Sequence, residues 1–157
     1  MTTPTPPLRK AARAILLDAD GRVLLLRYDE NGGFWATPGG ALEPGEDDAT
    51  ATLRELREEL GIDEHAVELG VQLAERRKDH FVGGLQIRQV ERYFLARISA
   101  AAVDPARATQ PDTIRELRWW TVSELQAATE TVYPAGLADL VAAIVEGHTP
   151  ERPVVLN

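Results

Sequence analysis

The sequence predicts an α/β (α+β) fold in which helices cover both faces of a mixed β-sheet. Apolar runs rich in Leu, Ile and Val recur along the 157 residues, and Gly, Asp and Asn lie between them, as in strands joined by turns. One segment has a helical pattern with both ends marked, and strands alternate with helices after it. Such alternation is typical of a sheet that buries its faces against helices.

The chain is long enough for one domain with its own core, and it contains no cysteine. Disulfide scaffolds, thiolate zinc sites and cysteine nucleophiles are therefore excluded. We expect a disordered lead-in at residues 1–7, a single domain over residues 8–149 and a tail at residues 150–157. The apolar end of that tail could join a sheet edge or a partner subunit, or the tail could be loose.

The charge of the chain narrows its partners. A formal net charge of −8 disfavours capture of a nucleic acid backbone, so we expect no nucleic acid polymer as a partner. No apolar run approaches the roughly 20 residues that span a bilayer, and the first ten residues lack the apolar core of a signal peptide. We expect no membrane partner and a cytoplasmic location. A divalent cation could still let an acidic protein bind a small phosphorylated molecule.

The N-terminal third predicts strands followed by a helix. Residues 11–30 hold two apolar runs separated by Asp18-Ala19-Asp20-Gly21, which predicts a hairpin. Residues 34–37 form a short apolar segment that Pro38-Gly39-Gly40 stops. Residues 47–60 are the clearest helix, because acidic residues open it and Gly61 stands where a left-handed residue usually ends a helix.

The remaining elements are predicted with weaker patterns. The expected elements are, in order, a strand at residues 67–77, a connection at residues 78–84, a strand at residues 84–99, an irregular loop at residues 100–113, a strand at residues 117–120, a capping box at residues 121–124 and a helix at residues 134–146.

Three glutamates, Glu55, Glu58 and Glu59, share one stripe of the predicted helix. As like charges at i,i+3 and i,i+4 they oppose helix formation, and they lie in the last turns, where the helix dipole favours cations. Arg54 offsets part of this conflict by pairing with Glu58, which leaves Glu55 and Glu59 on the far side. A solvated surface helix laced with Glu and Arg is one interpretation, and a bound cation is the other.

The residue types favour a particular cation. Carboxylate oxygens without Cys or a nearby His are hard ligands suited to Mg²⁺ or Mn²⁺. Mg²⁺ normally keeps several waters and is shared with substrate phosphates, so a phosphorylated ligand is expected to complete the site. Backbone carbonyls of the Gly- and Pro-rich loop before the helix are natural further ligands.

Residues 40–62 resemble the Nudix box. The motif reads Gly, five residues, Glu, seven residues, Arg-Glu, an aliphatic residue, any residue, Glu-Glu, any residue, Gly and an aliphatic residue. Every fixed position is filled here, by Gly40, Glu46, Arg54, Glu55, Leu56, Glu58, Glu59, Gly61 and Ile62. The sequence is therefore identified as a member of the Nudix hydrolase family.

The resemblance implies an α/β/α sandwich and metal-dependent hydrolysis of a nucleoside diphosphate linked to another moiety. Water attack at phosphorus suits this residue set, because it needs a metal and a proton acceptor but no nucleophilic side chain. By the same resemblance, Glu58 and Glu59 are expected as the principal metal ligands. Glu55 is expected as a ligand or as the base, and Gly40 as the donor of a backbone carbonyl.

Other roles follow from the resemblance with less support. Arg54 is expected to orient the glutamates, and Glu46 to support Arg54. Many family members take a further acid from beyond the box, and the candidates here are Asp112, Glu116 and Glu91, although an acid in or beside a strand is more often solvated. Nudix proteins are frequently dimers, so a homodimer is possible.

Basic and aromatic residues outside the box are candidate substrate contacts. Arg77 and Arg92 could clamp phosphates, because guanidinium groups match phosphate oxygens, or they could form cross-strand ion pairs. Trp35, Phe81 and Tyr93 could stack on a base, although burial in the core is commoner for aromatic residues.

Two other functions are open. A Nudix module that senses a nucleotide without hydrolysing it is the main alternative, and the intact glutamate set counts against it. An isoprenoid diphosphate isomerase on the same scaffold is less favoured, since the chain lacks cysteine. The substrate itself is not indicated: oxidised guanine nucleotides, dinucleoside polyphosphates, ADP-ribose and nucleotide sugars all fit.

Overall fold

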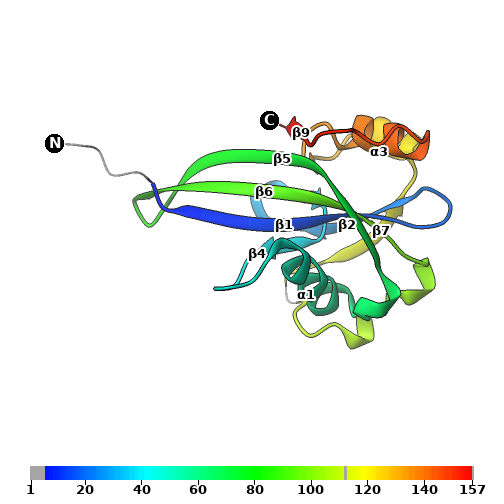
Figure 1. Cartoon of the computed structure of the whole chain (residues 1–157), viewed down its shortest axis with the longest axis horizontal. Helices are drawn as coiled ribbons and strands as arrows, with labels where there is room; N and C mark the ends of the chain where they lie inside the picture. The colour runs from blue at the N-terminus through cyan, green and yellow to red at the C-terminus, as the bar shows by residue number, and fades with distance from the viewer. Residues whose placement is uncertain (1–5, 112, 157) are drawn as a thin grey trace.

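The computed structural model describes residues 6–111 and 113–156, and it has a mixed β-sheet between two helical layers (Figure 1). The helix α1 lies below the sheet in this view, and α3 lies above it near the C-terminus. The helices are α1 (Asp48–Leu60), α2 (Val122–Gln126) and α3 (Leu137–Val145). The strands are β1 (Leu8–Leu17), β2 (Val23–Tyr28), β3 (Phe34–Ala36), β4 (Gly39–Ala41), β5 (Glu68–Val82), β6 (Leu85–Arg97), β7 (Glu116–Trp120), β8 (Val132–Tyr133) and β9 (Val154–Leu156). The α/β fold with helices on both faces is confirmed.

The sheet is built around β1 and β2. Within the described part of the chain, the strand order is β8-β3-β2-β1-β6-β5-β9, while β4 also pairs with β1 and β7 with β2. The pair β1–β6 is parallel over the whole of β1, whereas β1–β2, β2–β3 and β5–β6 are antiparallel. The N-terminal half of β1 pairs with β4, opposite Gly39, Gly40 and Ala41. The loop that precedes α1 is thereby tied to the middle of the sheet.

Alternate residues of β1 face two separate cores. Ile15 and Leu17 pack in a cluster that includes residues of α2 and α3, while Ala14 and Leu16 pack in a second cluster with Leu56 and other residues of α1. These four β1 side chains are at most 1% exposed, which explains the unbroken apolar run at residues 14–17. The side-chain period of two in β1 thus supports a helical layer on each face.

The first hairpin and the helix α1 form as the sequence predicts. The side chain of Asp47 accepts a hydrogen bond from the Thr50 amide at the start of α1, and Gly61 ends the helix with a left-handed backbone (φ 65°). The buried face of α1 consists of Ala51, Thr52, Leu56 and Leu60.

Two predicted boundaries are wrong. The strand β5 continues to Val82, so the predicted connection at residues 78–84 shrinks to a turn at Gly83 and Gly84, both with positive φ. The helix α3 begins at Leu137 and not at Pro134, because Gly136 has a left-handed backbone that interrupts the helical path.

β9 and the loop after β6 each pack against an earlier element of the chain. β9 pairs in parallel with β5, so the apolar end of the tail lies along the sheet edge. In the loop after β6, the Asp104 amide donates to the Leu60 carbonyl, and the Thr109 and Gln110 amides donate to the Glu58 carbonyl at 2.9 and 2.8 Å. The loop therefore satisfies carbonyls at the C-terminal end of α1.

No helix in the described residues is long and apolar enough to cross a membrane.

We predict that Gly61→Ala lowers the free energy of unfolding by more than about 2 kcal/mol. A Cβ at this position would overlap the Asp104 carbonyl oxygen, and the left-handed backbone costs an L-residue roughly 1–2 kcal/mol by itself. Gly45→Ala is the matched control, since Gly45 also has a positive φ (77°) but has nothing within 4 Å of an added Cβ. Urea denaturation of both variants measures the difference. Equal losses in the two variants would contradict the packing of the loop against α1.

Candidate active site

The guanidinium of Arg54 holds the acidic groups of α1 together. Its Nη1 donates to Glu55 Oε1 at 3.1 Å and to Glu58 Oε2 at 3.0 Å. Its Nε and Nη2 donate to the two carboxylate oxygens of Glu46 at 2.8 and 2.9 Å, and Nη2 also donates to the Ala41 carbonyl at 3.0 Å. The sequence predicts the contact with Glu58, but it does not predict that Arg54 also reaches Glu55. A planar fork of donors can make all these contacts at once, whereas a lysine ammonium cannot.

Glu46 is a strongly ionised member of this cluster. Its two hydrogen bonds from Arg54 lower the pKa of the carboxyl to about 2, and the Glu46 side chain is only 8% exposed. The bidentate pair joins the loop before α1 to the second turn of the helix, so the loop and the glutamate stripe are held in one geometry.

Glu59 lies on the other side of the stripe in a more buried setting. Its Oε1 accepts a hydrogen bond from the Gly39 amide at 2.8 Å, and its Oε2 accepts one from the Tyr28 hydroxyl at 3.4 Å. Burial, reinforced by the charge of Glu55, raises the pKa of Glu59 to about 7. Burial also raises the pKa of Glu55. Burial therefore disfavours the ionised forms of Glu55 and Glu59, and a bound cation would stabilise these forms.

Two glycines of β4 allow it to lie close to its neighbours, Gly40 to the Glu55 carboxylate and Gly39 to the backbone of β1. A Cβ at Gly40 would lie 2.6 Å from Glu55 Oε1, and a Cβ at Gly39 would overlap the Ala12 carbonyl oxygen of β1. Gly39 also has a φ of 141°, which other residues rarely adopt. The close approach of β4 to both α1 and β1 thus requires glycine at these positions.

The donor set fits a hard divalent cation, but the side chains are not gathered around one. Among residues 6–111 and 113–156, no group of three or more His, Asp or Glu side chains lies close enough to hold a metal ion. The Arg54 Nη1 instead lies between the carboxylates of Glu55 and Glu58, where its positive charge occupies the place of a cation. The carboxylate oxygens are half-buried, and the pKa values of Glu55 and Glu59 are raised. Oxygen ligands of this type suit Mg²⁺ or Mn²⁺.

Two of the candidate extra acids, Glu91 and Glu116, pair with other parts of the sheet. Glu91 is buried in β6, where it accepts hydrogen bonds from Arg13 at 2.5 Å and from the Tyr93 hydroxyl at 3.1 Å. Glu116 is an exposed residue of β7 opposite Arg27. Asp112 lies outside the described residues. None of the recorded contacts joins Glu91 or Glu116 to the glutamates of α1.

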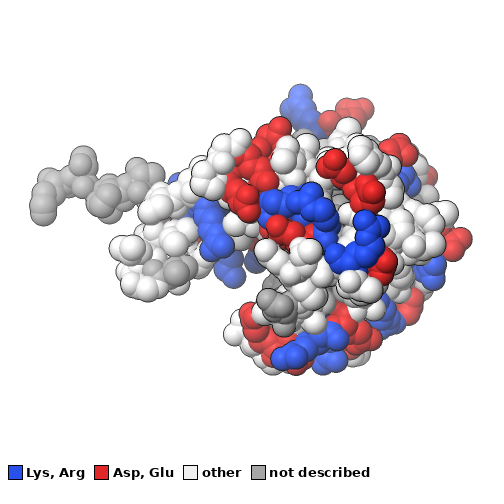
Figure 2. Space-filling view, turned by 90° about the horizontal axis from the view of Figure 1, so that it is seen from below, with Lys and Arg blue, Asp and Glu red and all other residues white. Residues whose placement is uncertain are grey.

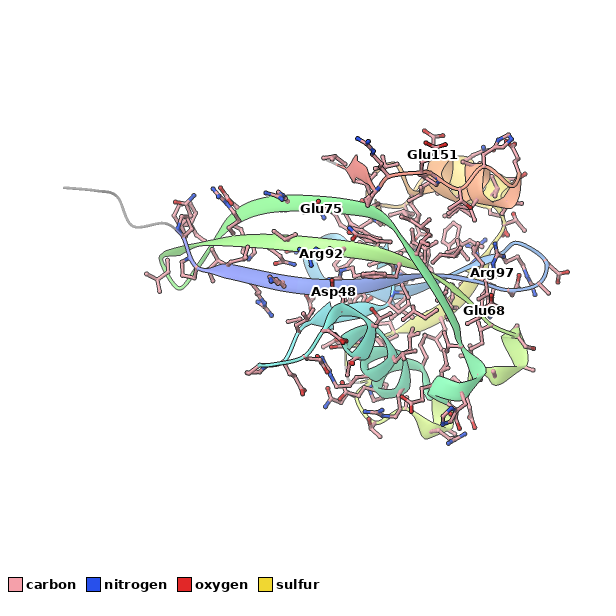
Figure 3. All side chains as sticks on the ribbon, viewed as in Figure 1. Asp48, Glu68, Glu75, Arg92, Arg97 and Glu151 are labelled. Carbon is pink, nitrogen blue, oxygen red and sulfur yellow. The ribbon has the colours of Figure 1, made fainter. Side chains whose placement is uncertain are left out.

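The predicted substrate arginines have acidic partners. Figure 3 shows Arg92 between Asp48 and Glu75, and Arg92 Nη1 lies 2.9 Å from Asp48 Oδ2 at the start of α1. Arg77 Nε lies 3.2 Å from Glu75 Oε1, and its side chain is 68% exposed. Both arginines also line a cavity of about 260 Å³ with Lys10 and other residues, so they remain available to an anion.

Charge is interspersed on the face that carries α1. Figure 2 shows acidic and basic side chains next to one another in the middle of this face, with further basic side chains toward the end from which the N-terminus projects. A protein with a net charge of −8 therefore still presents basic side chains on this face.

Sequence reasoning missed two residues that contact this site. Tyr28 reaches Glu59, and Arg13 of β1 donates to the Thr37 carbonyl two residues before Gly39. A signal for Arg13 exists, because it is a charged residue within the otherwise apolar run of residues 11–17. For Tyr28 the sequence gives no comparable signal, since the contact joins residues 31 positions apart.

Comparison with known proteins identifies the family. The model of the NUDIX domain matches residues 7–140. The chain therefore belongs to the Nudix hydrolase family. It is a Nudix-type pyrophosphohydrolase, an enzyme that acts on acid anhydrides.

Curated relatives and solved structures agree with this assignment. An RNA pyrophosphohydrolase from Rhodospirillum rubrum is 31% identical over 138 residues, which are 80% of this chain and 84% of that protein. A CTP pyrophosphohydrolase from Escherichia coli is 42% identical over 53 residues, 32% of this chain and 39% of that protein. The structure of a NUDIX hydrolase from Nitrosomonas europaea superposes with a TM-score of 0.68 at 20% identity, covers 92% of each chain and supports the fold.

The names of these relatives bear on the expected partners. Several of them are named RNA pyrophosphohydrolases. The expectation of no nucleic acid polymer stays a prediction.

We predict that Glu46→Gln lowers the free energy of unfolding by about 2 kcal/mol at pH 7, because it removes the charge of a bidentate pair. The pKa of Glu46 is about 2 in the folded protein and 4.5 ordinarily, so the stability from this pair is present above pH 4.5 and is lost as the pH falls through 2. Urea denaturation of both proteins at pH 7, 4.5 and 2.5 should show the difference shrinking with falling pH. A difference that is constant with pH would argue against the ion pair.

Proposed function

We propose that the protein is a Mg²⁺- or Mn²⁺-dependent pyrophosphohydrolase that cleaves the diphosphate bond of a nucleoside diphosphate linked to another moiety. The observation that carries this proposal is the set of three half-buried glutamates in the last turns of α1. Arg54 holds Glu55 and Glu58, and the Gly39 amide holds Glu59, although the helix dipole and the mutual repulsion of the carboxylates oppose the arrangement. A structural helix gains nothing from this arrangement.

Each residue of the cluster has a proposed role. Glu58 and Glu59 would hold the metal with Glu55 and the Gly40 carbonyl, and a bound metal would polarise the phosphate oxygens and lower the pKa of the attacking water. Arg54 positions Glu55 and Glu58 through its Nη1.

Proton transfer needs an acceptor whose pKa is not too low. Glu55 is the proposed acceptor, because burial raises the pKa of its carboxyl above the ordinary value. The water oxygen forms a bond to phosphorus as the bond to the bridging oxygen breaks, which yields two phosphorylated products without a covalent intermediate on the protein. Arg77 and Arg92 are proposed to contact the phosphates that face their shared cavity.

The substrate class has two candidates. A free nucleotide or nucleotide derivative is the first, and the relative named CTP pyrophosphohydrolase supports it. The triphosphorylated 5′ end of an RNA is the second, and the relatives named RNA pyrophosphohydrolase, about 30% identical over most of the chain, support it. Binding without hydrolysis remains the alternative to both.

The test is product release from a substrate panel with Mg²⁺, with Mn²⁺ and with excess EDTA. The panel contains nucleoside triphosphates, dinucleoside polyphosphates, ADP-ribose, nucleotide sugars and a triphosphorylated RNA oligonucleotide. We expect turnover of at least one class with metal and none in EDTA. Tight binding without turnover of any member would favour the nucleotide-sensing alternative.

We predict that Glu59→Gln reduces turnover at least about a hundredfold but does not lower the thermal midpoint in EDTA. The glutamine can still accept the Gly39 hydrogen bond, and the change removes a like charge beside Glu55 in the dipole-disfavoured end of α1. Differential scanning fluorimetry measures the midpoint. A clear loss of metal-free stability would show that Glu59 is a structural group.

A further inference from the structure

A cavity of about 120 Å³ lies next to Arg13 and Glu91, and we call it the side pocket. Phe34 and Ala36 of β3 and Tyr133 of β8 form its apolar wall, while Thr37, Arg76 and Glu91 are among its polar lining residues. Pockets that enclose a whole ligand have volumes of roughly 300–1,000 Å³, so the side pocket suits one compact part of a ligand.

The polar side contains a buried ionic network. Glu91 is 7% exposed and pairs with two guanidinium groups, Arg13 at 2.5 Å and Arg76 at 3.6 Å, and it also accepts the Tyr93 hydroxyl hydrogen bond. Two arginines around one carboxylate leave an excess positive charge. A buried charged network of this kind is costly as a core and is typical of functional sites.

Two buried polar atoms of the side pocket lack partners. Four side-chain polar atoms in the described residues are buried without a hydrogen-bond partner, and two of them, Thr37 Oγ1 and Arg76 Nε, belong to side chains that line this pocket. A buried donor without a partner is unfavourable, and a ligand that presents an acceptor to it would remove that cost.

The apolar wall is aromatic. The rings of Phe34 and Tyr133 meet edge to face with centroids 5.5 Å apart, and Tyr28 stacks on Phe34 at 5.2 Å. Tyr133 is 41% exposed, although it is a large aromatic residue. A partly exposed ring next to unpartnered polar atoms matches a planar ligand with a hydrogen-bonding edge.

Two paths connect the side pocket to Glu59. Through the aromatic wall, Phe34 stacks on Tyr28, whose hydroxyl donates to Glu59. Through the backbone, Arg13 donates to the Thr37 carbonyl, and the Gly39 amide two residues later donates to Glu59. A ligand that spans the side pocket and the glutamate cluster therefore places a planar group a short distance from its phosphates.

We propose that the side pocket binds the nucleobase of the substrate, with the aromatic wall against its face and with Arg76 and Thr37 at its polar edge. This inference rests on the proposed function, since it assigns one end of the same substrate. Residues of β3, β5, β6 and β8 thereby determine base preference, while α1 supplies the groups around the phosphates.

The test measures binding without catalysis. The four nucleoside 5′-monophosphates and ribose 5-phosphate are titrated calorimetrically in EDTA into the wild type and into Tyr133→Leu and Thr37→Val. Phe81→Leu is the matched control, because Phe81 is a 73% exposed aromatic residue at the far end of β5 that does not line the side pocket. Thr37→Val removes a hydroxyl without a partner in the described protein, so thermal stability should not fall.

We expect at least one monophosphate to bind better than ribose 5-phosphate to the wild type and to Phe81→Leu. Tyr133→Leu should weaken that binding about tenfold, and Thr37→Val should also weaken it, while ribose 5-phosphate is unaffected by either. The proposal is overturned if no monophosphate exceeds ribose 5-phosphate, or if both variants bind like the wild type. If binding depends on the base but no member of the substrate panel is turned over, the proposed hydrolysis is refuted and the base-binding role of the side pocket stands. If a substrate is turned over but binding does not depend on the base, the base-binding role of the side pocket is refuted and the proposed hydrolysis stands.

Discussion

The rest of the site depends on the Arg54 guanidinium. Five hydrogen bonds to Glu46, Glu55, Glu58 and the Ala41 carbonyl use its whole donor fork. These contacts hold like charges near one another on α1 and fix the preceding loop against the helix. Without them the repulsion between the glutamates would separate the side chains, and β4 and the loop that follows it would lose their anchor on α1.

Local signals in the sequence predict the parts of the structure that local contacts determine. Asp47 and Gly61 define α1 within a residue, and the spacing of the box identifies the glutamate stripe. The sequence alone does not predict the start of α3 or the end of β5. The left-handed Gly136 before α3 and the Gly83-Gly84 turn after β5 are each compatible with more than one boundary. The contacts of Arg13 and Tyr28 depend on which strands meet, which no local pattern encodes.

Arg13 links the two halves of the site. Its β1 neighbours Ile15 and Leu17 are core residues, yet at this position β1 pairs with β4 and β6. The Arg13 side chain contacts Glu91 on β6 and the Thr37 carbonyl between β3 and β4. A charged residue is tolerated there because it is paired with the carboxylate of Glu91. The same strand thus packs in the hydrophobic layers at one end and makes polar contacts at Arg13.

The packing of the loop after β6 against α1 has a consequence for the autonomy of the motif. The Thr109 and Gln110 amides hold the Glu58 carbonyl, and the Asp104 amide holds the Leu60 carbonyl, so a segment more than forty residues downstream completes the last turn of α1. Residues 40–62 transplanted as a peptide or into another scaffold would lack this support and would fray where the glutamates lie. The box is contiguous in sequence, but the chain as a whole gives it its shape.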